Sequence, residues 1–360
     1  MPRAIALALA ALALLATPAL AARHHHRGRK RHPPRSQVRT IPVSFTVVND
    51  NTSKVPCSSD GRTYTISGSL VLPAGPVPSA VTLYVHGLGY ARYFWDFTAV
   101  PGYDYAGTEA SDGHASVLID RLGYGRSSIP TGTATCVGSQ ATILHEIIQQ
   151  LRRGAYAAPT LTSAPTFDRV GLVGHSLGGQ LAEVEAYSYN DIDALGVVEW
   201  ADDASYSVGA YSAFASDITQ CLSGGHDQVG SSTAGYAAFG ETTAEYDALM
   251  FADVAPAVQT AANALRTLDP CGQIESTLTA IATDALNINS IRVPIAFVHA
   301  GDDGIFTDQL PWWQLQEGLY TSSPDVTNIS LPGEGHAVTL ERSAPKLQAA
   351  MNAWLTANGM

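Results

Sequence analysis

Short apolar segments alternate along the chain with segments that have a helical pattern. Residues 43–48 and 63–72 alternate apolar and polar positions, which predicts an antiparallel pair of strands. Continuous apolar runs predict six further strands, at residues 81–86, 115–120, 169–175, 193–200, 292–300 and 326–331. Amphipathic spacing predicts helices at residues 141–154, 181–190 and 343–359. Apolar strands that alternate with helices are typical of a parallel sheet covered on both faces, so an α/β fold is expected.

Residues 202–290 interrupt this alternation. They are rich in Ala, Ser, Thr and Tyr, contain a helical pattern at residues 255–268, and show no strong strand pattern. An ordinary connection between a strand and a helix is much shorter than this segment. We therefore expect a helical lid of residues 202–290, inserted between two parts of one core at residues 41–201 and 291–360.

The first forty residues have a different composition. After Arg3, residues 4–16 form an uninterrupted apolar run of 13 residues, and Ala19 and Ala21 then place small residues at the two positions that a signal peptidase reads. This run is too short to span a hydrocarbon core of ~30 Å as a helix. It predicts a signal peptide at residues 1–21, and hence a secreted protein, extracellular or periplasmic. An uncleaved membrane anchor is the alternative. Stable membrane insertion of the mature chain is not expected, because no later apolar run is long enough.

Residues 22–40 predict a basic, disordered tail, since their central part contains six Arg or Lys and four His without an apolar residue. Two alternatives are binding of anionic cell-surface polymers and loose metal binding by His24, His25 and His26. The remainder of the chain is acidic: residues 40–360 carry 12 basic and 32 acidic residues. Such a body repels phosphate backbones, so no nucleic-acid partner is expected.

Four cysteines fit an exported protein, because oxidising compartments permit disulfides. Their spacing is not that of zinc ligands, and no metal site is expected from them. Three pairings are possible, and unpaired thiols are a further alternative. We favour Cys57–Cys136 and Cys221–Cys271, because the second pair falls within the inserted segment.

The sequence GHSLGG at residues 174–179 matches the pattern G-x-S-x-G, between a predicted strand and a predicted helix. In this context the pattern forms a sharp turn that exposes a serine hydroxyl at a helix N-terminus, where negative charge is favoured. Ser176 is therefore the predicted nucleophile.

A serine nucleophile needs a base and an acid that orients the base. His336 follows the last predicted strand and is the predicted base. Asp303 follows the preceding strand and is the favoured acid, with Asp302 as the alternative.

Four segments together resemble the α/β-hydrolase superfamily over roughly residues 42–358. They are VHGLG (85–89), DRLGYGRSS (120–128), VGHSLGG (173–179) and PGEGHAVTLE (332–341). The resemblance implies an eight-stranded, mostly parallel sheet, with the inserted segment as a lid over the active site. The acid loop departs from the commonest pattern of the family, which places the aspartate where this chain has Gly304. The choice between Asp302 and Asp303 therefore stays open.

The same arrangement predicts an oxyanion hole and a substrate pocket. The backbone N–H groups of Leu177 and Leu88 are the expected oxyanion donors, with Gly87 less favoured than Leu88. His86 is expected to hold its loop in place. Aromatic residues near strand ends predict an apolar pocket, with core packing as the alternative for each of them: Tyr90, Phe94, Trp95 and Trp200.

The resulting hypothesis is a secreted serine hydrolase that cleaves carboxylic esters through an acyl-enzyme, without a cofactor. A serine nucleophile argues against haloalkane dehalogenases and epoxide hydrolases of this fold, which use aspartate. The expected substrate is a small-molecule or lipid-like ester, and the oligomeric state is left open. Two alternatives are an acyltransferase or cofactor-free peroxidase that uses the same residues, and a non-catalytic surface-binding protein with the same fold.

Overall fold

The computed structural model describes residues 38–202, 206–306 and 312–360. The expected signal peptide and most of the expected tail lie outside these residues. The first strand, β1, spans Arg39–Val48. Arg39 and Thr40 therefore belong to the sheet and not to the tail. Within the described ranges, no helix combines the length and the apolar character needed to cross a membrane.

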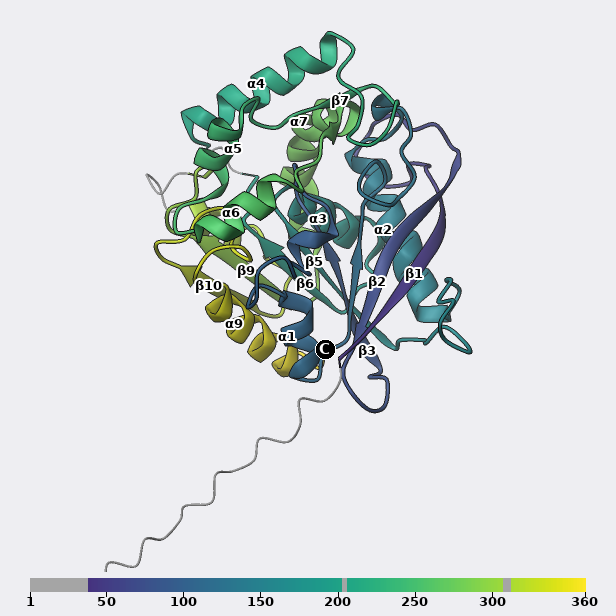
Figure 1. Ribbon diagram of the computed structural model, residues 1–360. Helices are drawn as coiled ribbons and strands as arrows, with labels where there is room; N and C mark the ends of the chain where they lie inside the picture. Colours follow the sequence, from purple (N-terminus) through teal and green to yellow (C-terminus); the bar gives the residue numbers. More distant parts are fainter. Residues whose placement is uncertain (1–37, 203–205, 307–311) are drawn as a thin grey trace, which may run out of the picture. The chain divides into compact units, whose positions relative to one another are not determined.

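Eight strands form one sheet in the order β1-β2-β4-β3-β5-β6-β9-β10 (Figure 1). β2 is antiparallel to both β1 and β4, and all other neighbours are parallel. This confirms the predicted eight-stranded, mostly parallel sheet. After β1, the strands are β2 (Thr63–Leu72), β3 (Ala80–Val85), β4 (Ser116–Ile119), β5 (Arg169–His175), β6 (Ala194–Val198), β9 (Ile295–Ala300) and β10 (Val326–Leu331).

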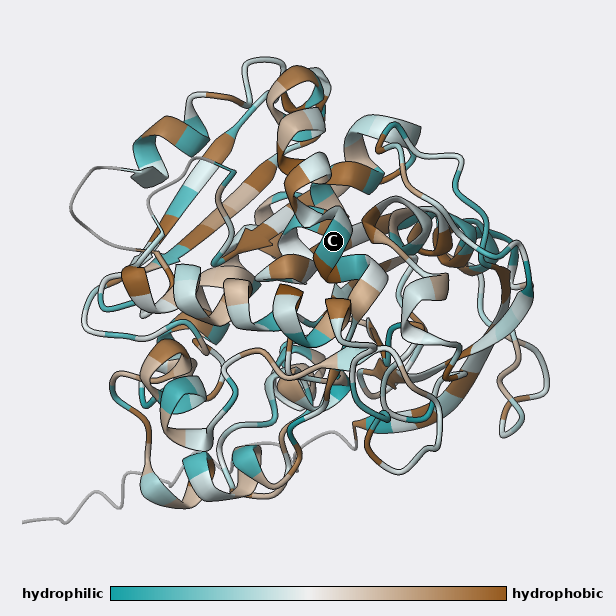
Figure 2. Cartoon of the chain, turned by 90° about the horizontal axis from the view of Figure 1, so that it is seen from above, coloured by the Kyte–Doolittle hydropathy of each residue, from teal (hydrophilic) through white to brown (hydrophobic). Residues whose placement is uncertain are grey.

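Helices cover the sheet. They are α1 (Tyr105–Ser111), α2 (Val137–Arg153), α3 (Leu177–Tyr189), α8 (Trp312–Glu317) and α9 (Ala344–Ala357), with short 3-10 turns at Arg92–Phe94, Gly132–Ala134 and Ile288–Ser290. α1 packs against α9, whereas α2 packs against α3. The central strands β3, β5, β6 and β9 are buried almost throughout, so both of their faces are covered. Figure 2 shows the apolar residues gathered on these strands and on the helix sides next to them.

The segment between β6 and β9 is described over residues 206–290, hereafter the inserted segment. It consists of α4 (Val208–Leu222), β7 (Tyr236–Ala237), α5 (Thr243–Met250), α6 (Pro256–Asn263), β8 (Asp269–Pro270) and α7 (Cys271–Asn287). It is largely helical as expected, but the antiparallel pair β7–β8 has no signal in the sequence pattern. α7 also packs against α2 and α3, so the inserted segment ends as part of a helical layer of the core.

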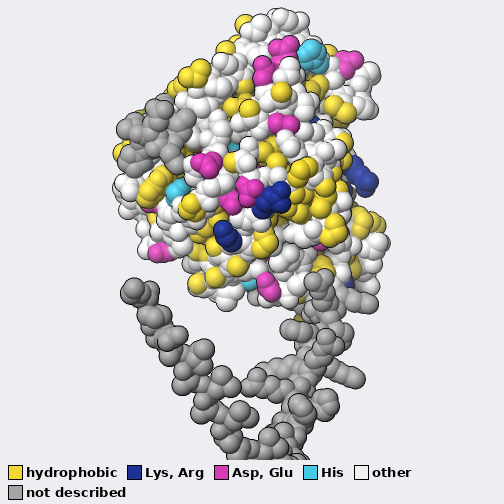
Figure 3. Space-filling view, turned by 60° about the vertical axis from the view of Figure 1, so that its left-hand side comes forward, with side chains coloured by type: hydrophobic (Ala, Val, Ile, Leu, Met, Phe, Trp, Pro, Cys, Tyr) yellow, Lys and Arg dark blue, Asp and Glu magenta, His cyan; other side chains and the backbone are white. Residues whose placement is uncertain are grey.

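Two disulfides connect the predicted pairs of cysteines. Cys57–Cys136 joins the loop after β1 to the start of α2 across 79 residues of sequence, and Cys221–Cys271 joins α4 to α7 across 50 residues. The second disulfide thus closes a loop inside the inserted segment. On the face shown in Figure 3, acidic side chains lie dispersed among apolar and uncharged ones.

Candidate active site

Ser176 lies at a strained turn between β5 and α3. Its backbone has a φ of 55° and a ψ of −128°, a conformation that non-glycine residues rarely adopt. The flanking glycines make this turn possible. A Cβ on Gly174 would lie 2.0 Å from the carbonyl oxygen of Gly178, and a Cβ on Gly178 would lie 2.7 Å from that of His86. The pattern G-x-S-x-G is thus required by close backbone contacts at this turn.

His336 and Asp303 form a buried pair. Nδ1 of His336 lies 2.7 Å from Oδ2 of Asp303, and both side chains are inaccessible to solvent. The other carboxylate oxygen, Oδ1, accepts hydrogen bonds from the backbone N–H groups of Ile305 (2.6 Å) and Phe306 (3.3 Å). These bonds orient Oδ2 toward the imidazole. Asp302 is exposed, so the carboxylate that meets His336 is that of Asp303.

The tautomer of His336 follows from this pair. A carboxylate oxygen only accepts, so Nδ1–H donates to Asp303 and the lone pair is on Nε2. Nε2 is buried and has no hydrogen-bond partner among the described residues. A neutral imidazole with a free basic nitrogen is the form that can take a proton from a hydroxyl.

His175 holds the backbone of His336. Its Nε2 donates to the carbonyl oxygen of His336 at 2.8 Å, and its ring stacks on Phe94 with the ring centroids 4.0 Å apart. Burial, with a contribution from the nearby His336, lowers the pKa of His175 well below its usual range. His175 therefore stays neutral and serves as a fixed donor. From the other side, Ala337 N–H donates to the carbonyl oxygen of Met250 at the end of α5.

The loop after β3 lies directly against Ser176. A Cβ on Gly87 would lie 2.7 Å from the Cβ of Ser176. His86 accepts from the N–H of Arg121 through Nε2 (3.2 Å), so its Nδ1–H donates to the carbonyl oxygen of Gly87 (2.9 Å). The Arg121 guanidinium donates to the same oxygen (3.0 Å). His86 thus holds the loop, as expected from the sequence.

The inserted segment also anchors this loop. Asp269 on β8 accepts hydrogen bonds from the N–H of Gly89 at 2.8 Å and from the hydroxyl of Tyr124 at 2.9 Å. Burial raises the pKa of Asp269 to about 6, although both hydrogen bonds lower it. Leu177 is the first residue of α3, and N–H groups in a first helical turn have no acceptor within the helix. Leu88 and Leu177 line the same cavity as Ser176.

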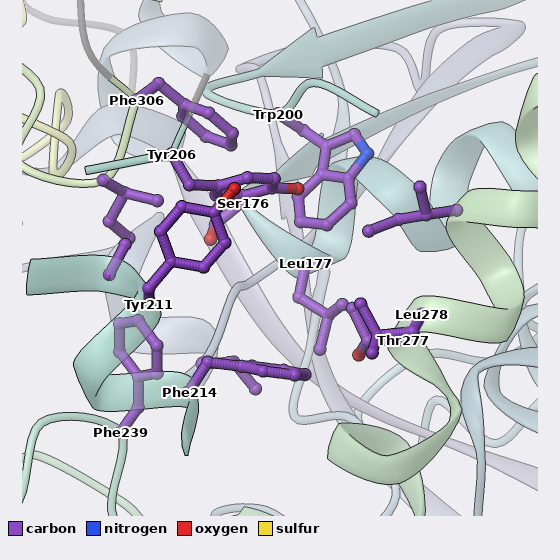
Figure 4. Close-up of a pocket in the computed structure, with 14 residues that line it drawn as sticks. Ser176, Leu177, Trp200, Tyr206, Tyr211, Phe214, Phe239, Thr277, Leu278 and Phe306 are labelled. Atoms are coloured by element: carbon purple, nitrogen blue, oxygen red, sulfur yellow. The ribbon is translucent and has the colours of Figure 1, made fainter. Parts of the chain in front are cut away.

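An apolar cavity of about 100 Å³ lies at this place. Ser176, Leu88, Leu177 and Trp200 from the core line it, together with Ile305 and Phe306. The remaining wall comes from the inserted segment: Tyr206, Ala210, Tyr211, Phe214, Phe239, Thr277, Leu278 and Ile281. Figure 4 shows aromatic side chains of both regions around Ser176. The arrangement can hold an apolar group next to the serine hydroxyl.

Of the four aromatic residues expected in the pocket, Trp200 lines the cavity and the other three do not. Tyr90, Phe94 and Trp95 are almost fully buried in the core. Trp95 packs on Tyr84, with the ring centroids 4.8 Å apart, and Phe94 packs on His175. These three residues follow the loop after β3 in sequence, but their side chains are buried in the packed interior. The aromatic wall comes instead from α4 and its neighbours.

Glu199 has a buried carboxyl group near the Asp303–His336 pair, and it is not among the site residues expected from the sequence. It follows β6 directly, with a φ of 51°. Its carboxylate and the ligand atoms of Asp303 and His336 all lie within 4.8 Å of one another, a group that could hold a metal ion. In this structure Nδ1 of His336 is already bonded to Asp303. The signal was present in the sequence as the single carboxylate at the end of the apolar strand GVVEW (196–200).

The chain belongs to the alpha/beta hydrolase family, because the sequence model of that family matches residues 83–350. The fold is similar to that of a thermophilic esterase from Thermogutta terrifontis, with a TM-score of 0.61 and 15% identity over 88% of this chain and 100% of that one. An esterase from Exiguobacterium antarcticum has a TM-score of 0.58 and 15% identity, over 81% and 96%. A monoacylglycerol lipase from Paleococcus ferrophilus has a TM-score of 0.57 and 16% identity, over 81% and 99%. A comparison with curated protein sequences gives no match. Family and fold together support hydrolase activity.

Proposed function

We propose that this protein is a secreted serine hydrolase that cleaves carboxylic esters through an acyl-enzyme. The observation that carries the proposal is the buried Asp303–His336 pair beside an apolar cavity that Ser176 lines. The esterase and lipase names of the structural neighbours agree with an ester substrate. Export favours water as the acyl acceptor, and the two disulfides agree with an oxidising compartment.

In the proposed mechanism, Ser176 Oγ attacks the ester carbonyl while Nε2 of His336 takes the hydroxyl proton. His336 then gives this proton to the leaving alcohol, and the acyl group stays on Ser176. A water molecule, deprotonated by the same nitrogen, attacks the acyl-enzyme and releases the acid. Asp303 stabilises the imidazolium that forms in both steps and keeps the ring in the reactive tautomer. The carboxyl group of Glu199 lies next to this pair.

The oxyanion of each tetrahedral intermediate would accept hydrogen bonds from the N–H groups of Leu177 and Leu88. Leu177 contributes as the first residue of a helix, whose N-terminal dipole also favours negative charge. Leu88 is held by the bonds that His86, Arg121 and Asp269 make to its two neighbours. Preorganised donors of this kind typically contribute ~10²–10³ in rate each.

The proposed substrate is a small-molecule or lipid-like ester with an apolar group next to the carbonyl. The cavity wall is formed by leucine, isoleucine and aromatic side chains, with no charged residue among those that line it. An apolar acyl or alcohol chain gains free energy when it leaves water for such a wall, whereas a charged group would lose its solvation.

The substitution Ser176→Ala tests the proposal directly. We expect kcat on short and medium p-nitrophenyl esters to fall by at least ~10³-fold, and labelling by a fluorophosphonate probe to disappear. Ser212→Ala is the matched control, because Ser212 is exposed on α4 and does not line the cavity. Full activity of the Ser176→Ala protein would exclude this serine as the nucleophile.

A separate experiment tests secretion. The chain is produced with its own N-terminus in a host that exports proteins, and the mature product is sequenced from its N-terminus. We expect the product outside the cytoplasm, beginning near residue 22. A product that keeps residues 1–21 and sediments with the membrane fraction would instead indicate an anchor.

A further inference from the structure

We propose that His145, Glu185 and Asp191 form a binding site for one divalent transition-metal ion, for which Zn²⁺ is the best chemical match. The site is separate from the candidate active site and does not depend on the proposed esterase function. Glu185 lies nine residues beyond Ser176 on α3, about 14 Å along the helix axis. A metal at this place would therefore be structural, and would not touch the reacting ester.

The three side chains come from neighbouring elements. His145 is on α2, Glu185 is on α3, and Asp191 follows α3 directly. Nδ1 of His145 lies 2.8 Å from Oδ2 of Asp191 and 4.0 Å from Oε1 of Glu185, and one ligand atom of each residue lies within 4.8 Å of the others. Ligand atoms around tetrahedral zinc are about 3.4 Å apart. The observed separations bracket this value, so small side-chain movements would complete the coordination.

Unsatisfied oxygens point to a cation at this place. Glu185 is fully buried, and neither of its carboxylate oxygens accepts a hydrogen bond from any residue in the described ranges. The same holds for Oδ1 of Asp191. Buried carboxylate oxygens without a donor cost free energy, and such groups are normally paired with a donor or coordinate a metal. Although Nδ1 of His145 lies close to Asp191, the two atoms do not have hydrogen-bond geometry.

The residues around the site hold the ligands in place. The ring of Tyr189 stacks on His145, with the centroids 4.1 Å apart and the planes 14° from parallel. The hydroxyl of Tyr189 is in turn hydrogen-bonded to Thr142 at 2.7 Å and to Thr52 at 2.9 Å. Gln149 donates through Nε2 to Oδ2 of Asp191. Partners of this kind fix the orientation of ligands in metal sites.

The site is accessible from solvent, because the side chains of His145 and Asp191 are partly exposed. His145 and Asp191 line an open surface groove together with Glu146, Gln149, Gln150 and Arg153. Arg153 contributes a positive charge to that groove and is hydrogen-bonded to Gln149. The neighbouring Arg152 is paired with Asp193 at 2.7 Å and donates a hydrogen bond to the carbonyl oxygen of Asp191 at 2.6 Å.

The types of ligand that His145, Glu185 and Asp191 offer indicate which class of metal ion the site would prefer. One imidazole and two carboxylates suit Zn²⁺ and related first-row ions, whereas Ca²⁺ and Mg²⁺ prefer oxygen ligands alone. Three protein ligands leave a coordination position toward the groove for water. The competing explanation is a proton shared between Glu185 and Asp191, which would satisfy two of the oxygens without a metal.

The experiment measures Zn²⁺ binding and thermal unfolding on the whole chain. His24, His25 and His26 are expected to bind Zn²⁺ as well, so the quantity compared is the difference in Zn²⁺ stoichiometry between variants. We expect the wild type to bind one more Zn²⁺ per chain than His145→Ala, and Zn²⁺ to raise the unfolding temperature of the wild type but not that of His145→Ala. Glu185→Gln should weaken that binding by ~tenfold or more. His226→Ala, at an exposed position in the inserted segment, is the control and should behave as wild type.

Two outcomes would overturn the proposal. One is equal Zn²⁺ stoichiometry in the wild type and in His145→Ala, which would assign all binding to other groups. The other is the absence of any Zn²⁺-dependent stabilisation of the wild type. The glutamine in Glu185→Gln can still donate a hydrogen bond to Asp191. If a shared proton alone explains the cluster, the metal-free variant should therefore be as stable as the wild type, and Zn²⁺ should stabilise neither protein. Unfolding of each metal-free variant shows whether it is folded before Zn²⁺ is added.

Discussion

The two regions that meet at the cavity are built differently. The loops at the carboxyl ends of the strands hold Ser176, Asp303 and His336 by a strained turn and by directional hydrogen bonds, and these side chains are buried. The inserted segment contributes apolar side chains that make nondirectional contacts, and some of them are partly in solvent: Tyr211 is 56% exposed and Leu278 is 64% exposed. Under the proposed function, the contrast separates a region whose geometry must be fixed for chemistry from a region whose apolar contacts impose less geometric constraint.

Asp303→Asn tests the fixed region and should have the largest effect. Asparagine can present its NH₂ group to Nδ1 and so favour the wrong tautomer of His336. We expect kcat to fall by ~10³–10⁴-fold with little change in KM. Steady-state kinetics on one ester measure this. Asp302→Asn is the control, because that side chain is exposed. A comparable loss of kcat in Asp302→Asn would show that Asp303 is not the residue that orients His336.

Removal of the disulfide in the inserted segment tests how independent that region is. Closing a loop of 50 residues stabilises the folded state by about 4 kcal/mol in the chain-entropy estimate. We expect the double change Cys221→Ser and Cys271→Ser to lower the free energy of unfolding by up to that amount and to raise KM more than it lowers kcat.

The matched control for that experiment is removal of Cys57–Cys136, which closes a loop of 79 residues in the core. It should cost a similar free energy of unfolding but leave KM close to the wild-type value. Denaturant unfolding and ester kinetics on both double variants give the comparison. If both raise KM equally, the two regions do not differ in the way described.

Phe214→Ala tests whether the variable region sets the acyl preference. Phe214 lines the cavity from α4, and its loss would enlarge the cavity next to Ser176. We expect kcat/KM for longer acyl chains, relative to acetate, to change by about tenfold. A panel of p-nitrophenyl esters measures the ratio. Leu222→Ala on the same helix is the control, since Leu222 is 79% exposed and does not line the cavity; it should keep the wild-type ratio.

Asp217→Asn should have the smallest effect, and this effect should depend on pH. Burial, with a contribution from Asp269, raises the pKa of Asp217 on α4 to about 8. A raised carboxyl pKa means that the folded state holds a proton which the unfolded chain has lost, so stability falls as pH rises from about 4 to 8. Asparagine removes this term. We expect the unfolding temperature to rise at pH 8.5 and to stay unchanged near pH 4.

The control for this substitution is Asp227→Asn, at an exposed position of the same segment. The core contains a similar group, because burial raises the pKa of Glu109 on α1 to about 7. Both regions should therefore lose stability toward alkaline pH. An unfolding temperature of the wild type that rises steadily from pH 5 to pH 8 would contradict this expectation.

The strands were the easiest part of the fold to predict. The apolar run at residues 169–175 has the bounds of β5, because a strand buried on both faces needs an uninterrupted apolar sequence. The run at residues 326–331 has the bounds of β10, although this strand lies at the edge of the sheet and is only partly buried. The short pair β7–β8 could not be predicted, since two-residue strands carry no periodic pattern. The helix α1 was also missed, because seven residues with Gly107 inside them give little helical signal.

The candidate site divides in the same way. Ser176, His336 and Asp303 follow strands at one edge of the sheet, and the parallel order brings such positions together. Pocket residues depend instead on which side of a loop faces the cavity. Tyr90 and Trp95 turn inward, whereas Tyr206 turns to the cavity from a segment remote in sequence. Proximity along the chain carries no information about that direction.

The hydrogen bond from Gly89 to Asp269 has a consequence for engineering this protein. Together with the bond from Ala337 to Met250, it links the inserted segment both to the loop after β3 and to the loop that contains His336. The segment is therefore not an exchangeable module. A chimera that takes the corresponding segment from a relative would leave a buried N–H without its acceptor, unless the graft supplies a carboxylate at position 269. Exchange of substrate range between relatives should thus proceed by point changes along α4 and not by transplanting the whole insertion.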